Sequence, residues 1–83
     1  MHSDVQGRVA KIIANTLNID HEKLVLEAKF SEFKQIDSLA MIELIMAIET
    51  EFGIEISDEE TIQMKTIRDI VEHVQEALKK NPE

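Results

Sequence analysis

The fold of this 83-residue chain is decided by residues 37–53, which read DSLAMIELIMAIETEFG. Apolar residues recur here at the three- and four-residue spacings of an α-helix, and glycine commonly ends a helix. On a helical wheel of about 100° per residue, one apolar face is made of Met41, Leu44, Ile45, Ile48 and Phe52. We therefore predict a helix that begins near Ser38, ends at Gly53 and packs this face into a core.

A second, smaller apolar strip lies on another side of the same wheel. Its residues are Leu39, Ile42 and Met46, and they share that side with Glu43, Glu49 and Thr50. One interpretation is that Leu39 and Ile42 touch the long loop and that Met46 is an ordinary exposed methionine. The other is a docking surface, in which apolar contacts supply binding and the acids orient a basic partner.

A first helix is predicted from Ser3, where Ser3 and Gln6 form an S-x-x-Q capping box. Its apolar stripe consists of Val5, Val9, Ile12, Ile13 and Leu17, and Asn18 is the expected stop. Residues 19–36 then form a long connection, which we expect four apolar side chains to pin onto the core: Ile19, Leu24, Leu26 and Phe30. A loop of this length in a compact domain is often functional.

Two further helices follow residue 53. Ile54 and Ile56 hold down a short connection, and a second capping box at residues 57–60 (SDEE) starts a short helix that runs to about Met64. Thr66 caps the last helix, whose core stripe is Ile67, Ile70, Val71, Val74 and Leu78. We place the core of one all-α domain, residues 1–83, at about residues 4–78 and expect residues 79–83 to form a frayed tail, with Lys79 and Lys80 where positive charge suits a helix end.

Size and charge narrow the classes of function. A chain of 83 residues makes one domain and leaves little room for a deep enzyme cleft. Its 17 acidic and 9 basic residues give a net charge of −8, which repels nucleic acids and anionic membranes and favours partners with basic patches. With no long apolar run and no signal-peptide pattern, we expect no membrane association and a cytoplasmic location.

Nothing in the sequence points to catalysis or to a metal. The three histidines, His2, His21 and His73, lie far apart along the chain, so no Ser-His-Asp grouping is indicated. There is no cysteine, which excludes disulfides and cysteine-based metal sites. The acidic run at residues 58–60 lacks the ligand spacing of an EF-hand.

In this setting Asp37-Ser38-Leu39 resembles the prosthetic-group attachment segment of the acyl carrier proteins. The resemblance extends from about Val5 to about Val74, and its most specific further parts are residues 43–44 (EL), 46–49 (MAIE), 51–56 (EFGIEI) and 58–60 (DEE). It implies a monomeric four-helix bundle with a short third helix and a long loop between the first two helices.

The resemblance also implies a function. A phosphopantetheinyl transferase would move a 4′-phosphopantetheine arm from coenzyme A onto Ser38, beside Asp37 and Leu39. The arm would hold acyl groups as thioesters and present them to acyl-transferring or synthase enzymes of lipid or fatty-acid biosynthesis. The chain would be a carrier and not an enzyme, and these enzymes would dock on the acid-rich second helix through Leu39, Ile42, Glu43, Met46 and Glu49.

Three positions depart from the family pattern, which usually reads Leu-Gly-x-Asp-Ser-Leu followed by an acid. Gln35 replaces the glycine, Ala40 replaces the acid and Thr50 stands where an acid is common. Without the glycine we expect the loop to take another path, and the changes favour a specialised carrier over a general fatty-acid carrier. Two alternatives stay open: a peptidyl or aminoacyl carrier, and an acidic helical interaction module in which Ser38, like Asp37, is a plain N-cap.

Overall fold

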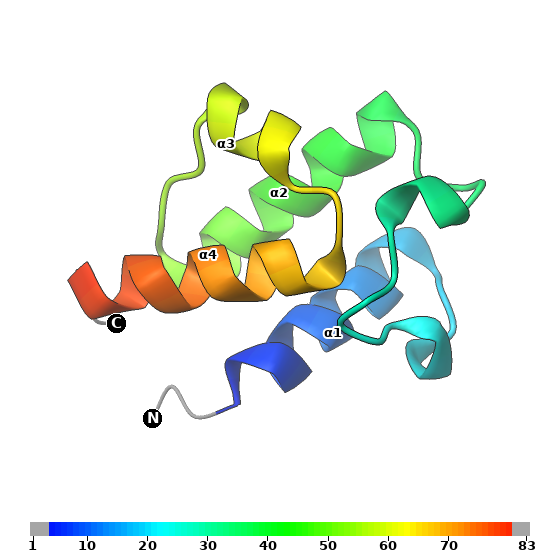
Figure 1. Ribbon diagram of the computed structural model, residues 1–83, viewed down its shortest axis with the longest axis horizontal. Helices are drawn as coiled ribbons and strands as arrows, with labels where there is room; N and C mark the ends of the chain where they lie inside the picture. The colour runs from blue at the N-terminus through cyan, green and yellow to red at the C-terminus, as the bar shows by residue number, and fades with distance from the viewer. Residues whose placement is uncertain (1–3, 81–83) are drawn as a thin grey trace.

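The computed structural model describes residues 4–80, and within that range it is all-α, with no named β-strand. The helices are α1 (Val5–Leu17), α2 (Ser38–Phe52), α3 (Asp58–Gln63) and α4 (Ile67–Lys80) (Figure 1). Two single-turn 3-10 helices, η1 (His21–Lys23) and η2 (Phe30–Glu32), lie in the connection between α1 and α2. The predicted order of four helices, with a short third one and a long first loop, is confirmed.

Three of the helices build the core. α1 packs against both α2 and α4, and in Figure 1 α1 and α4 run in opposite directions while α3 lies across the top. The largest fully buried side chains come from these three helices alone: Val5, Val9, Ile13, Leu44, Ile48, Ile67, Ile70 and Val74. α3 contains no buried residue, so its place in the bundle depends on its flanks and its polar contacts.

The long connection is held to the start of α4 by backbone hydrogen bonds. The N–H of Phe30 donates to the carbonyl of Lys65 (2.9 Å), and the N–H groups of Ile67 and Arg68 donate to the carbonyls of residues 28 and 26 (3.1 and 3.0 Å). Ile19, Leu24 and Phe30 are buried as predicted, and Leu26 packs against the core while partly exposed. This pairing and the two 3-10 turns were not predicted, and they fix the path of the chain toward α2.

The ends of the helices agree only in part with the sequence analysis. α1 ends at Asn18 in the left-handed conformation (φ 56°), as expected, but its N-cap is Asp4, whose side chain makes no capping hydrogen bond. Ser3, and with it the predicted capping box, lies outside the described residues. The predicted tail began too early, because Lys79 and Lys80 form the last turn of α4, where cations suit the helix dipole. Residues 81–83 are also outside the described range.

Reciprocal caps start both α3 and α4. Ser57 and Glu60 form the predicted capping box of α3. At α4, the N–H of Asp69 donates to the Thr66 hydroxyl (3.2 Å), while the Asp69 carboxylate accepts from the N–H groups of Lys65 and Thr66 (2.8 and 3.0 Å). These backbone donors, Lys65 first, lower the pKa of Asp69. Both helices therefore begin where the sequence predicted.

Within residues 4–80, no helix is long and apolar enough to cross a membrane.

α2 ends at Gly53, which adopts the left-handed conformation at φ 64° with open space around its Cα. Replacing it with alanine creates no clash, so the cost comes from the backbone alone. We expect Gly53→Ala to lower the free energy of unfolding by about 1 kcal/mol, measured by urea denaturation. Gly53→Asn is the matched control and should cost less, because asparagine tolerates this conformation, as Asn18 does at the end of α1. Equal stability of the alanine variant and the parent would contradict this account.

Candidate functional site

The N-terminus of α2 is capped by Asp37 and not by Ser38. Asp37 has an extended backbone (φ −99°, ψ −170°), and its Oδ1 accepts a hydrogen bond from the N–H of Ala40 at 2.8 Å. Ser38 is the first helical residue, its side chain is exposed, and within residues 4–80 no hydrogen bond engages its hydroxyl. The plain N-cap interpretation is therefore confirmed for Asp37 and wrong for Ser38.

The loop that leads to Ser38 is anchored by apolar side chains. Phe33 and Ile36 are half-buried and pack against the core, and the N–H of Ile36 donates to the carbonyl of Phe33 at 3.1 Å. Gln35 is exposed, and among residues 4–80 the only non-glycine residue with positive φ is Asn18. The loop thus reaches α2 without the left-handed conformation that a glycine would provide. Ala40, in the first turn of α2, is buried.

This arrangement suits a phosphate-containing group attached to Ser38. The N–H groups of the first helical residues, Ser38 and Leu39, precede the first intrahelical donors, and the positive end of the helix dipole lies here. Both features favour an anion. The carboxylate of Asp37 would oppose one, but its Oδ1 is already turned to the N–H of Ala40. The donors present therefore fit a phosphodiester on the serine oxygen.

The predicted exposed strip is present on α2. Leu39, Ile42 and Met46 are 64%, 55% and 59% exposed, and Glu43 beside them is exposed as well. The face of α2 predicted for the core is buried, apart from Met41, which is half-buried. Large parts of all three side chains face solvent, and Met46 is exposed, as the first interpretation of the strip also expected.

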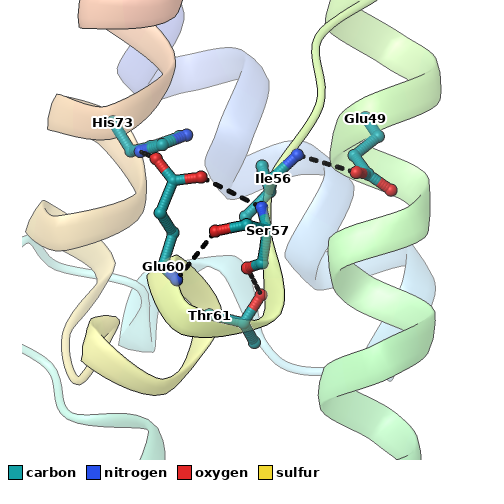
Figure 2. Close-up of polar contacts among 6 residues, drawn as sticks. All are labelled: Glu49, Ile56, Ser57, Glu60, Thr61 and His73. Atoms are coloured by element: carbon teal, nitrogen blue, oxygen red, sulfur yellow. Dashed lines mark hydrogen bonds and ion pairs between the residues drawn. The ribbon is translucent and has the colours of Figure 1, made fainter.

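Glu49 differs from the other acid of this surface. It is half-buried, and its Oε2 accepts a hydrogen bond from the N–H of Ile56 at 2.8 Å, across the turn that follows α2 (Figure 2). Its side chain therefore fixes the α2–α3 connection in addition to any contact that it makes with a partner. A helical wheel shows only the residues of one helix, so it could not predict this hydrogen bond to the following loop.

Sequence reasoning missed two exposed apolar residues, Val25 in the long connection (52% exposed) and Ile62. Ile62 on α3 is 70% exposed, more than any residue of the α2 strip. Six residues of helix are too few to show an apolar face, so no pattern singled it out. Between α2 and α3 lies a small hollow of about 150 Å³, lined in part by Ile42, Met46, Glu49 and Thr61.

Among residues 4–80, no three His, Cys, Asp or Glu side chains are placed to hold a metal ion.

The capping geometry predicts effects of different size on stability for two adjacent positions. Asp37→Ala leaves the N–H of Ala40 without its acceptor and should lower the free energy of unfolding by about 1 kcal/mol. Ser38→Ala removes a hydroxyl that makes no hydrogen bond in the described structure, and should change stability by less than about 0.5 kcal/mol. Urea denaturation followed by circular dichroism measures both. A larger loss for Ser38→Ala than for Asp37→Ala would contradict the assignment of the cap.

Comparisons with known proteins agree with this geometry. The family model described as a phosphopantetheine attachment site matches residues 7–74. An acyl carrier protein of Thermosynechococcus vestitus is 46% identical over 72 residues, which cover 87% of this chain and 89% of that protein. An acyl carrier protein of Buchnera aphidicola is 41% identical over 78 residues, covering 94% and 99%.

The fold has a solved counterpart as well. The solution structure of a holo acyl carrier protein from Geobacter metallireducens superimposes with a TM-score of 0.83 and covers 96% of this chain and 90% of that one. At 21% identity this likeness supports the fold alone. From the family match and the two close relatives, the chain belongs to the acyl carrier protein family, whose prosthetic group is 4′-phosphopantetheine.

Proposed function

We propose that Ser38 is the residue that carries the 4′-phosphopantetheine arm, and that the chain presents acyl groups to enzymes of lipid or fatty-acid biosynthesis. The observation that carries the proposal is the exposed Ser38 hydroxyl, which the Asp37 cap leaves without a hydrogen bond at the N-terminus of α2. When bound, the arm supplies the thiol that forms thioesters, which a chain without cysteine cannot supply itself.

The residues around Ser38 would then have separate tasks. Asp37 starts the helix and sets the position of the serine, and the amides of Ser38 and Leu39 offer hydrogen bonds to the phosphodiester. Leu39, with its exposed apolar side chain, stands where an enzyme that reaches the arm would first make contact. None of these groups is needed as an acid or base, which supports a carrier without catalytic activity of its own.

Partner enzymes would dock on the exposed strip of α2. Leu39, Ile42 and Met46 offer apolar contact, and Glu43 offers a charge that attracts a basic patch. The phosphopantetheinyl transferase and the acyl-transferring or synthase enzymes are the partners that this surface suits. In this proposal Glu49 acts mainly by holding the connection after α2, through its bond to Ile56. A monomeric state and a cytoplasmic location stay predictions.

A specialised role is the finer part of the proposal. Ala40 is buried where the family commonly has an acid beside Ser38, exposed Thr50 stands where an acid is common farther along α2, and exposed Gln35 replaces the usual glycine of the loop. The general fatty-acid enzymes should therefore load and elongate on this chain poorly, and normal efficiency would contradict the specialised role. Loading with an amino acid by an adenylating enzyme would instead indicate an aminoacyl carrier.

Attachment at Ser38 is tested by intact-protein mass. The chain is incubated with coenzyme A, magnesium and a broad-specificity phosphopantetheinyl transferase. The parent should gain one arm and Ser38→Ala none, because among the serines of residues 4–80 only this one stands exposed at the start of a helix with an aspartate cap before it. Ser31→Ala, in the exposed turn η2, is the matched control and should gain one arm. Addition to Ser38→Ala would overturn the site, and no addition to the parent would favour an unmodified interaction module.

The docking surface is tested by reversing one charge. Glu43→Lys should lower the kcat/KM of the transferase for this chain by roughly tenfold, because the reversed charge slows the encounter with a basic patch. Glu22→Lys, in the exposed turn η1 and off the α2 surface, changes the net charge equally and should lower the kcat/KM far less. The ratio of the two effects should shrink as salt is added. Equal losses in both variants would show that net charge alone matters, not the surface on α2.

A further inference from the structure

α3 is attached to the bundle by polar contacts on two sides. Its own residues are not buried, whereas the residues beside it, Ile56 and Met64, are. Toward α2, the N–H of Ile56 donates to Glu49 at 2.8 Å. Toward α4, the contact is made by Glu60, whose Oε2 lies 3.4 Å from Nδ1 of His73 (Figure 2).

Glu60 uses its two carboxylate oxygens for two different contacts. Oε1 accepts from the N–H of Ser57 at 3.0 Å and completes the capping box that starts α3. Oε2 faces His73, which is half-buried on α4. The same side chain therefore starts the helix and ties it to its neighbour. Figure 2 shows this arrangement from Ser57 through Glu60 to His73.

The surroundings of His73 are strongly acidic. It lines two hollows, of about 610 and 220 Å³, on either side of its contact with α3. The charged groups that line them with it are Glu55 from the α2–α3 connection, Glu60 from α3, and Asp69, Glu72, Glu76 and Lys80 from α4 itself. Five of these six groups are carboxylates, and Lys80 is the one cation among them.

We propose that the charge on His73 sets how firmly α3 is held against α4, so that this corner of the bundle is tighter in mildly acidic than in mildly alkaline solution. An imidazolium gains an ion pair with Glu60, and a neutral imidazole loses it. The same α3 borders the hollow beside Ile42 and Met46. The shape of that hollow therefore follows the charge on His73, whether or not Ser38 is modified.

The pH range of the effect follows from the two partners. The N–H and hydroxyl of Ser57, ahead of the charge of His73, lower the pKa of Glu60. A lowered pKa means that the contribution of the carboxylate is present above the ordinary glutamate value and is lost only as pH falls through the lowered one. The contribution of a histidine cation is present at low pH and is lost as pH rises through the range in which imidazole titrates, because the unperturbed pKa of histidine is about 6.5. The ion pair therefore operates between these two limits.

The test is amide hydrogen exchange by NMR on the unmodified chain, at about pH 5.5 and about pH 8, on either side of the imidazole range. Rates are divided by those of an unstructured peptide at the same pH, which removes the intrinsic effect of base. The open fraction of α3, read at residues 60–64, should be about threefold larger at the higher pH, as for the loss of a surface ion pair. The buried amides of α1 should change much less.

Four variants, one of them double, separate this ion pair from general repulsion among the acids. Glu60→Gln keeps an S-x-x-Q capping box but removes the charge. It and His73→Gln should each abolish the threefold change, and the double variant should change nothing more. His21→Gln, exposed in η1, is the control and should keep the full change. Persistence of the change in His73→Gln, or its absence from the parent, would overturn the proposal.

Discussion

The hydrogen bond from the N–H of Ala40 to the carboxylate of Asp37 is the interaction on which the proposed site depends. It begins α2 at Ser38 and satisfies a donor that would otherwise compete for the serine hydroxyl. It also turns a negative side chain toward the helix and away from the space in front of it. A serine that capped its own helix would be less free to accept a large group.

The rest of the bundle keeps this turn in place. α1, α2 and α4 share one apolar core, and the long connection before Ser38 is bonded through its backbone to the start of α4. Arg8 of α1 adds a link at the far end of α2, where its guanidinium lies 4.4 Å from the centre of the Phe52 ring and 3.2 Å from Glu51. α3 has no buried residue of its own. It is therefore the helix whose attachment to the bundle depends most on charged side chains.

Local chemistry made most of the fold predictable from the sequence. Apolar spacing predicted the buried faces of the long helices. Gly53 predicted the end of α2, and Ser57 and Thr66 predicted the starts of α3 and α4, because each of these signals acts within a few residues of chain. The pairing of residues 26–30 with residues 65–68 left no such pattern, since its donors and acceptors are distant in sequence. The helical wheel placed Glu49 on a solvent face because a wheel shows one helix alone. It therefore could not predict the hydrogen bond that Glu49 accepts from Ile56 in the following loop. At the site, Asp37 and Ser38 are both good capping residues, and only the geometry distinguished them.

The most direct measurement of the central claim is peptide mapping of the modified chain by tandem mass spectrometry. Cleavage after Lys34 and Lys65 releases residues 35–65, which contain four hydroxyl side chains: Ser38, Thr50, Ser57 and Thr61. Fragment ions should place the phosphopantetheine arm on Ser38 alone. The account would be contradicted if the arm were found on Ser57 or Thr61, whose hydroxyls are both engaged at the start of α3.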